Sequence, residues 1–266
     1  MHEYLRELPR CAVVLDLGSS LGSFDSRLYE FTTILVDLEP PNLLRNPRSL
    51  DVCADMACLP MRSRCADAVI CNHSLEHVLN LDAALTEIGR VSKEGGFLFV
   101  AVPDAATLCD QLYRWLAREG GHVNHFTSAT DLASKIERLT GLQHCGTRPL
   151  FTSFSYLNRK NRRAKAPRKM LMLGGGNERF LLIGTGILRL LDRIFRARLT
   201  RYGWALYFGR GHGASMEPGW RNVCIRCGAG HPSAALLSSN RVNRHLFGLK
   251  TYACPACDTL NFFSND

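Results

Sequence analysis

Four cysteines near the end of the sequence are grouped in two pairs with the spacing of metal ligands. Cys224 and Cys227 form one Cys-x-x-Cys pair, and Cys254 and Cys257 form the other. Four thiolates from two such turns make a closed tetrahedral zinc site. A redox dithiol is the alternative, but it does not account for two matched pairs. The spacing therefore predicts structural zinc bound by all four cysteines, with no open position for metal catalysis.

A glycine loop follows the first apolar stretch of the chain. Residues 11–17 are apolar except for Asp16 and are typical of a buried strand, and Gly18 and Gly22 come after them. Glycines at this place allow the backbone to approach a bound ligand closely. Asp37 ends the next apolar run, so its carboxylate is placed to bond a ribose diol. A dinucleotide fingerprint needs G-x-G-x-x-G, and its middle and last glycines are absent here.

Apolar runs and helical patterns alternate along the chain, and the strands and helices that they predict position the residues of the glycine loop. Runs typical of strands cover 11–17, 32–37, 50–53, 66–71, 97–102, 142–157 and 202–208. Helical patterns cover 81–91, 105–118, 129–139 and 181–199. Continuous apolar strands separated by helices predict an α/β fold with a parallel sheet covered on both faces.

The glycine loop resembles motif I of the class I S-adenosylmethionine (SAM) dependent methyltransferases, acid-x-Gly-x-Gly-x-Gly. Asp16, Gly18 and Gly22 match that pattern, and Ser20 replaces its middle glycine. Later segments resemble the family's following motifs in the same order. By this resemblance the cofactor-binding residues are Asp16, Gly18, Ser20, Gly22, Asp37, Leu38, Asp55, Met56 and Asn72.

The resemblance also implies a fold and a domain organisation. The family has a Rossmann-like sheet of seven strands, in the order 3-2-1-4-5-7-6 with strand 7 antiparallel. It implies a SAM-dependent methyltransferase domain over 1–210, with a basic helical insertion at about 158–200. Residues 218–266, which contain the two cysteine pairs, resemble a small zinc ribbon.

Methyl transfer is an in-line displacement, and it needs a general base only when the acceptor must lose a proton. Polar residues after the fourth and fifth predicted strands are the candidates for orienting or deprotonating an acceptor. The histidines among them are His73, His77, His122 and His125, and a structural role is the alternative for each. No Asn-Pro-Pro-aromatic or Asp-Pro-Pro-aromatic run follows the fourth strand, which argues against methylation of amino groups on DNA bases.

Charge is concentrated in one segment. Residues 151–217 contain 14 Lys and Arg against 3 Asp and Glu. Three explanations fit this excess of basic residues. They are a solvated basic loop with a packed helix, RNA binding, and binding of residues 158–201 to a membrane surface. We expect a small-molecule, sugar or lipid-linked acceptor, with RNA as the alternative. A SAM-binding or zinc-dependent interaction module without turnover is a further alternative.

The apolar segments are too short for a membrane span. The sequence begins without an apolar signal segment, and its longest apolar stretch covers only residues 180–188. These features favour a soluble, cytoplasmic protein.

Overall fold

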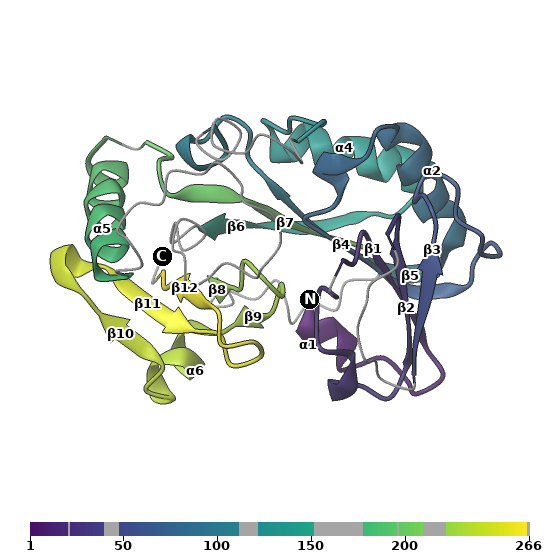
Figure 1. Cartoon of the computed structure of the whole chain (residues 1–266), viewed down its shortest axis with the longest axis horizontal. Helices are drawn as coiled ribbons and strands as arrows, with labels where there is room; N and C mark the ends of the chain where they lie inside the picture. Colours follow the sequence, from purple (N-terminus) through teal and green to yellow (C-terminus); the bar gives the residue numbers. More distant parts are fainter. Residues whose placement is uncertain are drawn as a thin grey trace.

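Seven strands form one mixed sheet in the computed structural model, which describes residues 1–20, 22–39, 48–111, 122–151, 178–195, 197–209 and 222–264. The strands are β1 (Val13–Leu17), β2 (Thr32–Asp37), β3 (Ser49–Cys53), β4 (Ala66–Asn72), β5 (Ser92–Pro103), β6 (His144–Phe151) and β7 (Arg201–Gly209). Their order is β3-β2-β1-β4-β5-β7-β6, and β7 runs antiparallel to both neighbours. The predicted strand order is therefore confirmed (Figure 1).

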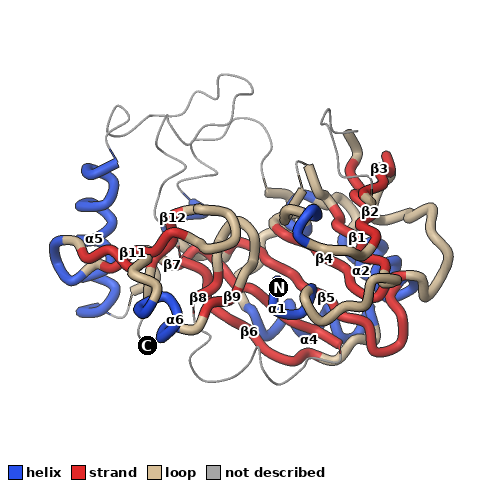
Figure 2. The backbone as a smooth tube through the Cα atoms, turned by 90° about the horizontal axis from the view of Figure 1, so that it is seen from below, coloured by secondary structure: helices blue, strands red, loops and turns tan. Residues whose placement is uncertain are grey.

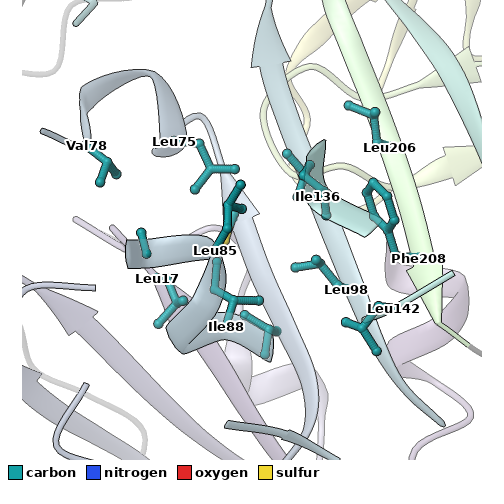
Figure 3. Packing of buried hydrophobic residues seen from close by; sticks show 14 of the residues in the cluster. Leu17, Leu75, Val78, Leu85, Ile88, Leu98, Ile136, Leu142, Leu206 and Phe208 are labelled. Carbon is teal, nitrogen blue, oxygen red and sulfur yellow. The ribbon is translucent and has the colours of Figure 1, made fainter. Parts of the chain in front are cut away.

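Two amphipathic helices, α2 (Leu81–Val91) and α4 (Ala129–Thr140), cover one face of the sheet. Asn80 and Ser128 cap their first turns by accepting hydrogen bonds from Ala83 N and Asp131 N. Figure 3 shows the core on this side, where side chains of both helices pack on the strands. The labelled members include Leu85, Ile88, Ile136, Leu98, Leu206 and Phe208.

Among the described residues, the opposite face of the sheet is covered by other segments than helices that connect its strands. The described residues of the β1–β2 connection contain only the short 3-10 helix η1 (Ser26–Leu28), so no α-helix follows the glycine loop. Instead, the one-turn helix α1 (His2–Leu5) packs its Tyr4 ring on Phe97, with ring centroids 4.1 Å apart. Figure 2 looks onto this side, where α1 and the C-terminal residues lie in front of the sheet.

The C-terminal residues fold into two small sheets around a core of their own. A hairpin pairs β8 (Asn222–Val223) with β9 (Gly230–His231), and the helix α6 (Ser233–Ser238) follows. The second sheet has the order β10-β11-β12, formed by Val242–Arg244, Lys250–Ala253 and Leu260–Phe262. We call residues 222–264 the C-terminal module.

The longest described helix, α5 (Glu178–Phe195), lies between β6 and β7 along the chain. It overlaps the predicted helix at 181–199. Residues 158–177, which belong to the expected basic insertion, fall outside the described residues. In the part of the chain that the structure describes, no helix is long and apolar enough to cross a bilayer.

Candidate functional site

A cavity of about 370 Å³ opens at the carboxyl ends of β1, β2 and β4. Ligands bind at such a place in α/β sheets because the chain connections on either side of the first strand diverge there. The residues that line it are Gly18, Ser20, Val36, Asp37, Leu38, Ala54, Asp55, Met56, His73, Ser74, His77, Val78 and Leu79. We call this cavity the cofactor cleft.

The glycine loop forms one wall of the cofactor cleft. Gly18 has a φ of +66°, which favours glycine, and a Cβ there would lie 2.5 Å from Ser74 Cβ. Ser20 N donates a hydrogen bond to Asp37 Oδ2 at 2.7 Å, so the loop is tied to the end of β2. The Asp37 carboxylate therefore stands at the cleft with a fixed orientation.

The Asp16 side chain fixes the end of the glycine loop through hydrogen bonds to Ser23. Its buried carboxylate accepts hydrogen bonds from Ser23 N at 2.8 Å and Ser23 Oγ at 2.6 Å. Burial raises the pKa of Asp16 to about 6, and the nearby Asp37 charge adds to this shift. Asp16 shapes the cleft without lining it, as does Gly22, whose φ is +90°.

Six of the nine residues predicted to bind cofactor line the cleft, namely Gly18, Ser20, Asp37, Leu38, Asp55 and Met56. Asp55 Oδ1 accepts from Ala57 N at 2.9 Å, which fixes the turn after β3. Asn72 departs from the prediction. Its Nδ2 donates to the carbonyl oxygen of Arg226 at 2.7 Å, so its side chain joins β4 to the C-terminal module.

His73 also contacts the C-terminal module. Its Nε2 lies 2.7 Å from the carbonyl oxygen of Ile225, and its Nδ1 lies 3.4 Å from Tyr202 Oη. A carbonyl oxygen only accepts, so Nε2 carries the proton. Burial lowers the pKa of His73 to about 4, which keeps the ring neutral at pH 7. His73 lines the cleft, but these bonds suit a positioning role better than proton transfer.

His77 and His122 lie together beside the cleft, with ring centroids 5.1 Å apart. Both follow strands of the sheet in sequence, and only His77 lines the cleft itself. His122 Nδ1 lies 2.6 Å from Asp110 Oδ1. His125, the fourth predicted histidine, is exposed and absent from the cleft lining.

Two buried acids lie next to these histidines. Glu76 is one of the polar residues after the fourth strand that the sequence offered as candidates, whereas Asp110 was not predicted. Glu76 is 1% exposed and Asp110 is 2% exposed. Burial raises the pKa of Glu76 to about 8. Asp110 lies in a stretch with a helical pattern, where an acid reads as a surface residue.

The structure brings the four predicted metal-ligating cysteines together. Their sulfur atoms all lie within 4.8 Å of one another. Cys224 Sγ is 3.6 Å from Cys257 Sγ, and Cys227 Sγ is 3.7 Å from Cys254 Sγ. Zn–S bonds of about 2.3 Å in a tetrahedron place sulfurs about 3.8 Å apart, so this donor set fits zinc. None of the four cysteines forms a disulfide.

The four-cysteine cluster is docked on the sheet. Besides the bonds from Asn72 and His73 to Arg226 and Ile225, the turn at Gly228 packs against Phe99 of β5. A Cβ on Gly228 would lie 2.6 Å from that ring. We call the turn Cys224–Cys227, with its bonds to Asn72 at the end of β4 and to His73 just after it, the knuckle contact.

Comparison with known proteins finds similarity in the first part of the chain. Residues 15–100 match a family model described as a methyltransferase domain. An uncharacterized protein of Methanocaldococcus jannaschii is 37% identical over 98 residues, which cover 36% of this chain and 43% of that protein.

Solved structures show a similar fold at low sequence identity. One belongs to a complex between the Haloferax volcanii Trm112 methyltransferase activator and a methyltransferase, with a TM-score of 0.51, 14% identity, and coverage of 79% of this chain and 88% of that one. Another is phosphoethanolamine N-methyltransferase 2 of Haemonchus contortus in complex with SAM, with a TM-score of 0.51, 14% identity, and coverage of 79% and 51%. Residues 15–100 are therefore similar to a methyltransferase domain, and the chain shares the fold of these solved structures.

Proposed function

Starting from the methyltransferase domain at residues 15–100, we propose that this chain transfers a methyl group from SAM to an acceptor at the cofactor cleft. One observation carries the proposal. Residues from four separate segments meet at the topological switch point of the sheet, and six of them are those that the family resemblance assigns to the cofactor. A SAM-binding or zinc-dependent interaction module without turnover is the alternative.

The lining of the cleft suits the parts of SAM. The Asp37 carboxylate would accept hydrogen bonds from the ribose hydroxyls, and Leu38, Met56 and Val78 offer apolar surface to a flat ring. The Asp55 side chain stands beside them. Bound SAM supplies a methyl group on a positively charged sulfur. This chain's residues would orient it and hold an acceptor atom in line with it.

Replacing Asp37 by asparagine is expected to weaken binding of SAM and of S-adenosylhomocysteine by about tenfold to hundredfold. The change removes the charge that would bond the ribose, while an amide oxygen can still accept from Ser20 N. Asp82→Asn is the matched control because Asp82 is exposed on α2 and absent from the cleft lining. Calorimetric titration measures both. Equal affinities for the two variants would contradict the assignment of the cleft to SAM.

We infer that the four-cysteine cluster binds structural zinc. The sulfur separations fit tetrahedral coordination, and Cys224, Cys227 and Cys254 are buried. A closed set of four thiolates leaves no coordination position for a substrate. Zinc would therefore stabilise the C-terminal module and, through the knuckle contact, the carboxyl end of β4.

Helix α5 supports an acceptor that is presented at a membrane surface. Its apolar residues at the spacing i, i+4, i+7 and i+11 face outward, namely Ile183, Ile187, Leu190 and Ile194, and Phe195 is 71% exposed beside them. We call these five residues the apolar strip. A helix that only covered a sheet would turn such a face inward.

Polar residues of α5 face the protein instead. Asp192 accepts hydrogen bonds from Leu199 N and Thr200 N, and Arg189 lies 4.0 Å from the centre of the Phe151 ring. Arg193 is exposed in the last turn, in a segment with a large excess of basic residues. An outward apolar strip with basic flanks suits the surface of an anionic bilayer. We infer that α5 lies on such a surface and gives the cleft access to a lipid-linked acceptor.

The chain is expected to bind vesicles that contain phosphatidylglycerol. The double variant Ile187→Glu and Ile194→Glu is expected to bind them much more weakly. Each burial of such a side chain contributes about 1.5–3 kcal/mol, so bound protein should fall by roughly tenfold or more. Leu28→Glu is the control, because Leu28 is 60% exposed on η1, outside the strip. Co-sedimentation gives the answer. Equal binding by both variants would contradict the role of the strip, and steeply salt-dependent RNA binding without vesicle binding would favour RNA instead.

A further inference from the structure

A second group of metal-ligating side chains stands beside the cofactor cleft. Glu76 and His77 belong to the 3-10 helix η2 (Leu75–His77) that follows β4, and His122 comes from the segment before α4. One ligand atom from each of the three lies within 4.8 Å of the other two. His77 also lines the cleft, so the group borders the space where an acceptor would meet the cofactor.

Backbone bonds hold this group together. Val123 N and Asn124 N donate to the carbonyl oxygen of Glu76 at 2.8 and 3.0 Å. The Asn124 side chain donates to the carbonyl oxygens of Leu75 and Val78. The segment that carries His122 is therefore fixed to η2, and the approach of the three side chains is built into the fold.

The surroundings of His122 and Glu76 point to a cation. His122 Nδ1 lies 2.6 Å from Oδ1 of the buried Asp110. A carboxylate beside one ring nitrogen is the usual way in which a protein orients a metal-ligating histidine. Glu76 is 1% exposed, and its Oε2 accepts no hydrogen bond from the residues that the structure describes. A buried carboxylate oxygen needs a partner, and a metal ion beside it would be one.

We propose that Glu76, His77 and His122 bind a divalent metal ion, separate from the four-cysteine cluster. Two imidazoles and one carboxylate suit zinc, manganese, iron(II) or cobalt(II). Ligand atoms about 2.0–2.2 Å from one ion are at most ~4.4 Å apart. The three ligand atoms here lie within 4.8 Å of one another, close to that limit.

Three protein ligands leave coordination positions open, and this has a consequence for the acceptor. Given the proposed methyl transfer, the site would bind an acceptor through oxygen, as a hydroxyl or phosphate group. A coordinated hydroxyl loses its proton more readily. Its oxygen would then form the new bond to the methyl carbon as the carbon–sulfur bond of SAM breaks, giving S-adenosylhomocysteine and the released proton.

The number of zinc ions that the chain binds tests the site formed by Glu76, His77 and His122 without an activity assay. The whole chain, titrated with Zn²⁺ in a calorimeter, is expected to bind two equivalents. His77→Ala and His122→Ala should each bind one, and Asp110→Asn should weaken the second equivalent by about tenfold to hundredfold. His125→Ala is the matched control from the same segment, since His125 is exposed and outside the group, and it should still bind two.

The outcomes separate this site from the methyltransferase proposal. A single equivalent bound by the unchanged chain, or a second equivalent that persists in both histidine variants, would overturn the site. Retained folding of those variants is checked by their thermal unfolding. Binding of two zinc equivalents without binding of SAM would support the metal site and contradict the cofactor assignment. Binding of SAM with only one zinc equivalent would support the cofactor assignment and contradict the metal site.

Discussion

Replacing Cys227 by serine is expected to unfold the C-terminal module. Cys227 is 2% exposed, and the core of this module is built around the cysteines. Modules of this size depend on the metal to fold, and structural zinc contributes about 10–16 kcal/mol of binding free energy in comparable sites. Loss of one thiolate opens the site and leaves the three others without a complete coordination shell.

The same substitution is expected to weaken the cofactor cleft. His73 and Ser74 line the cleft, and the knuckle contact joins His73 and Asn72 to the C-terminal module. Unfolding of the module releases these bonds and uncovers Phe99 on the sheet. SAM affinity should therefore fall together with the thermal stability of the module.

Thermal unfolding and limited proteolysis with and without a chelator measure the first effect, and SAM titration measures the second. Cys11→Ser is the matched control, because Cys11 is exposed and lies far from the cysteine pairs in sequence. A Cys227→Ser variant that matches Cys11→Ser in protease resistance and unfolding temperature would contradict a structural metal in the module.

Replacing Gly203 by alanine is expected to destabilise the sheet by at least about 3 kcal/mol, the upper part of the range for overpacked sites. Gly203 pairs with Pro103 across β5 and β7, and a Cβ there would lie 1.9 Å from the carbonyl oxygen of Val102. The clash is with backbone, so the two strands must separate locally. Tyr202, which contacts His73, would move with them.

Gly184→Ala on α5 is the matched control for that substitution. An added Cβ at Gly184 meets nothing within 4 Å, and alanine favours a helix by about 0.5–1 kcal/mol over glycine. Thermal unfolding should show a fall of roughly 6–12 °C for Gly203→Ala, at 2–4 °C per kcal/mol for chains of this size, and no fall for Gly184→Ala. Similar unfolding temperatures for the two variants would contradict the pairing of β5 with β7 at this position.

The strands and the glycine loop were predictable because their signals are local. The apolar run at 32–37 coincides with β2, and the run at 66–71 coincides with β4 except for Asn72. Asp37 is the last residue of such a run, so its place at the edge of the sheet follows from the strand assignment alone. The strand order came from the family resemblance, which the structure matches.

Contacts between distant segments were not predictable in the same way. The family resemblance predicted that Asn72 binds cofactor, but its side chain bonds to Arg226, which is 154 residues away in the sequence. The cover on the second sheet face is another example, since α1 and the C-terminal module lie at opposite ends of the chain. No local pattern indicates that a metal-ligating turn replaces a covering helix.

The grouping of Glu76, His77 and His122 depends on both kinds of signal. Histidines after a strand are visible in the sequence, whereas the Asp110 carboxylate behind His122 becomes apparent only when the chain is folded. The apolar residues of α5 were visible too. Their outward orientation was not, because a helical pattern alone does not say which face meets the protein.

Calorimetric titration of the zinc-loaded chain with SAM, and separately with NAD, tests the central claim most directly. The arrangement of the glycine loop, Asp37 and Asp55 around one cleft predicts saturable one-to-one binding of SAM and no binding of NAD. Binding of NAD without SAM would mean that the cleft serves a dinucleotide, and binding of neither would contradict a functional cofactor site at this edge of the sheet.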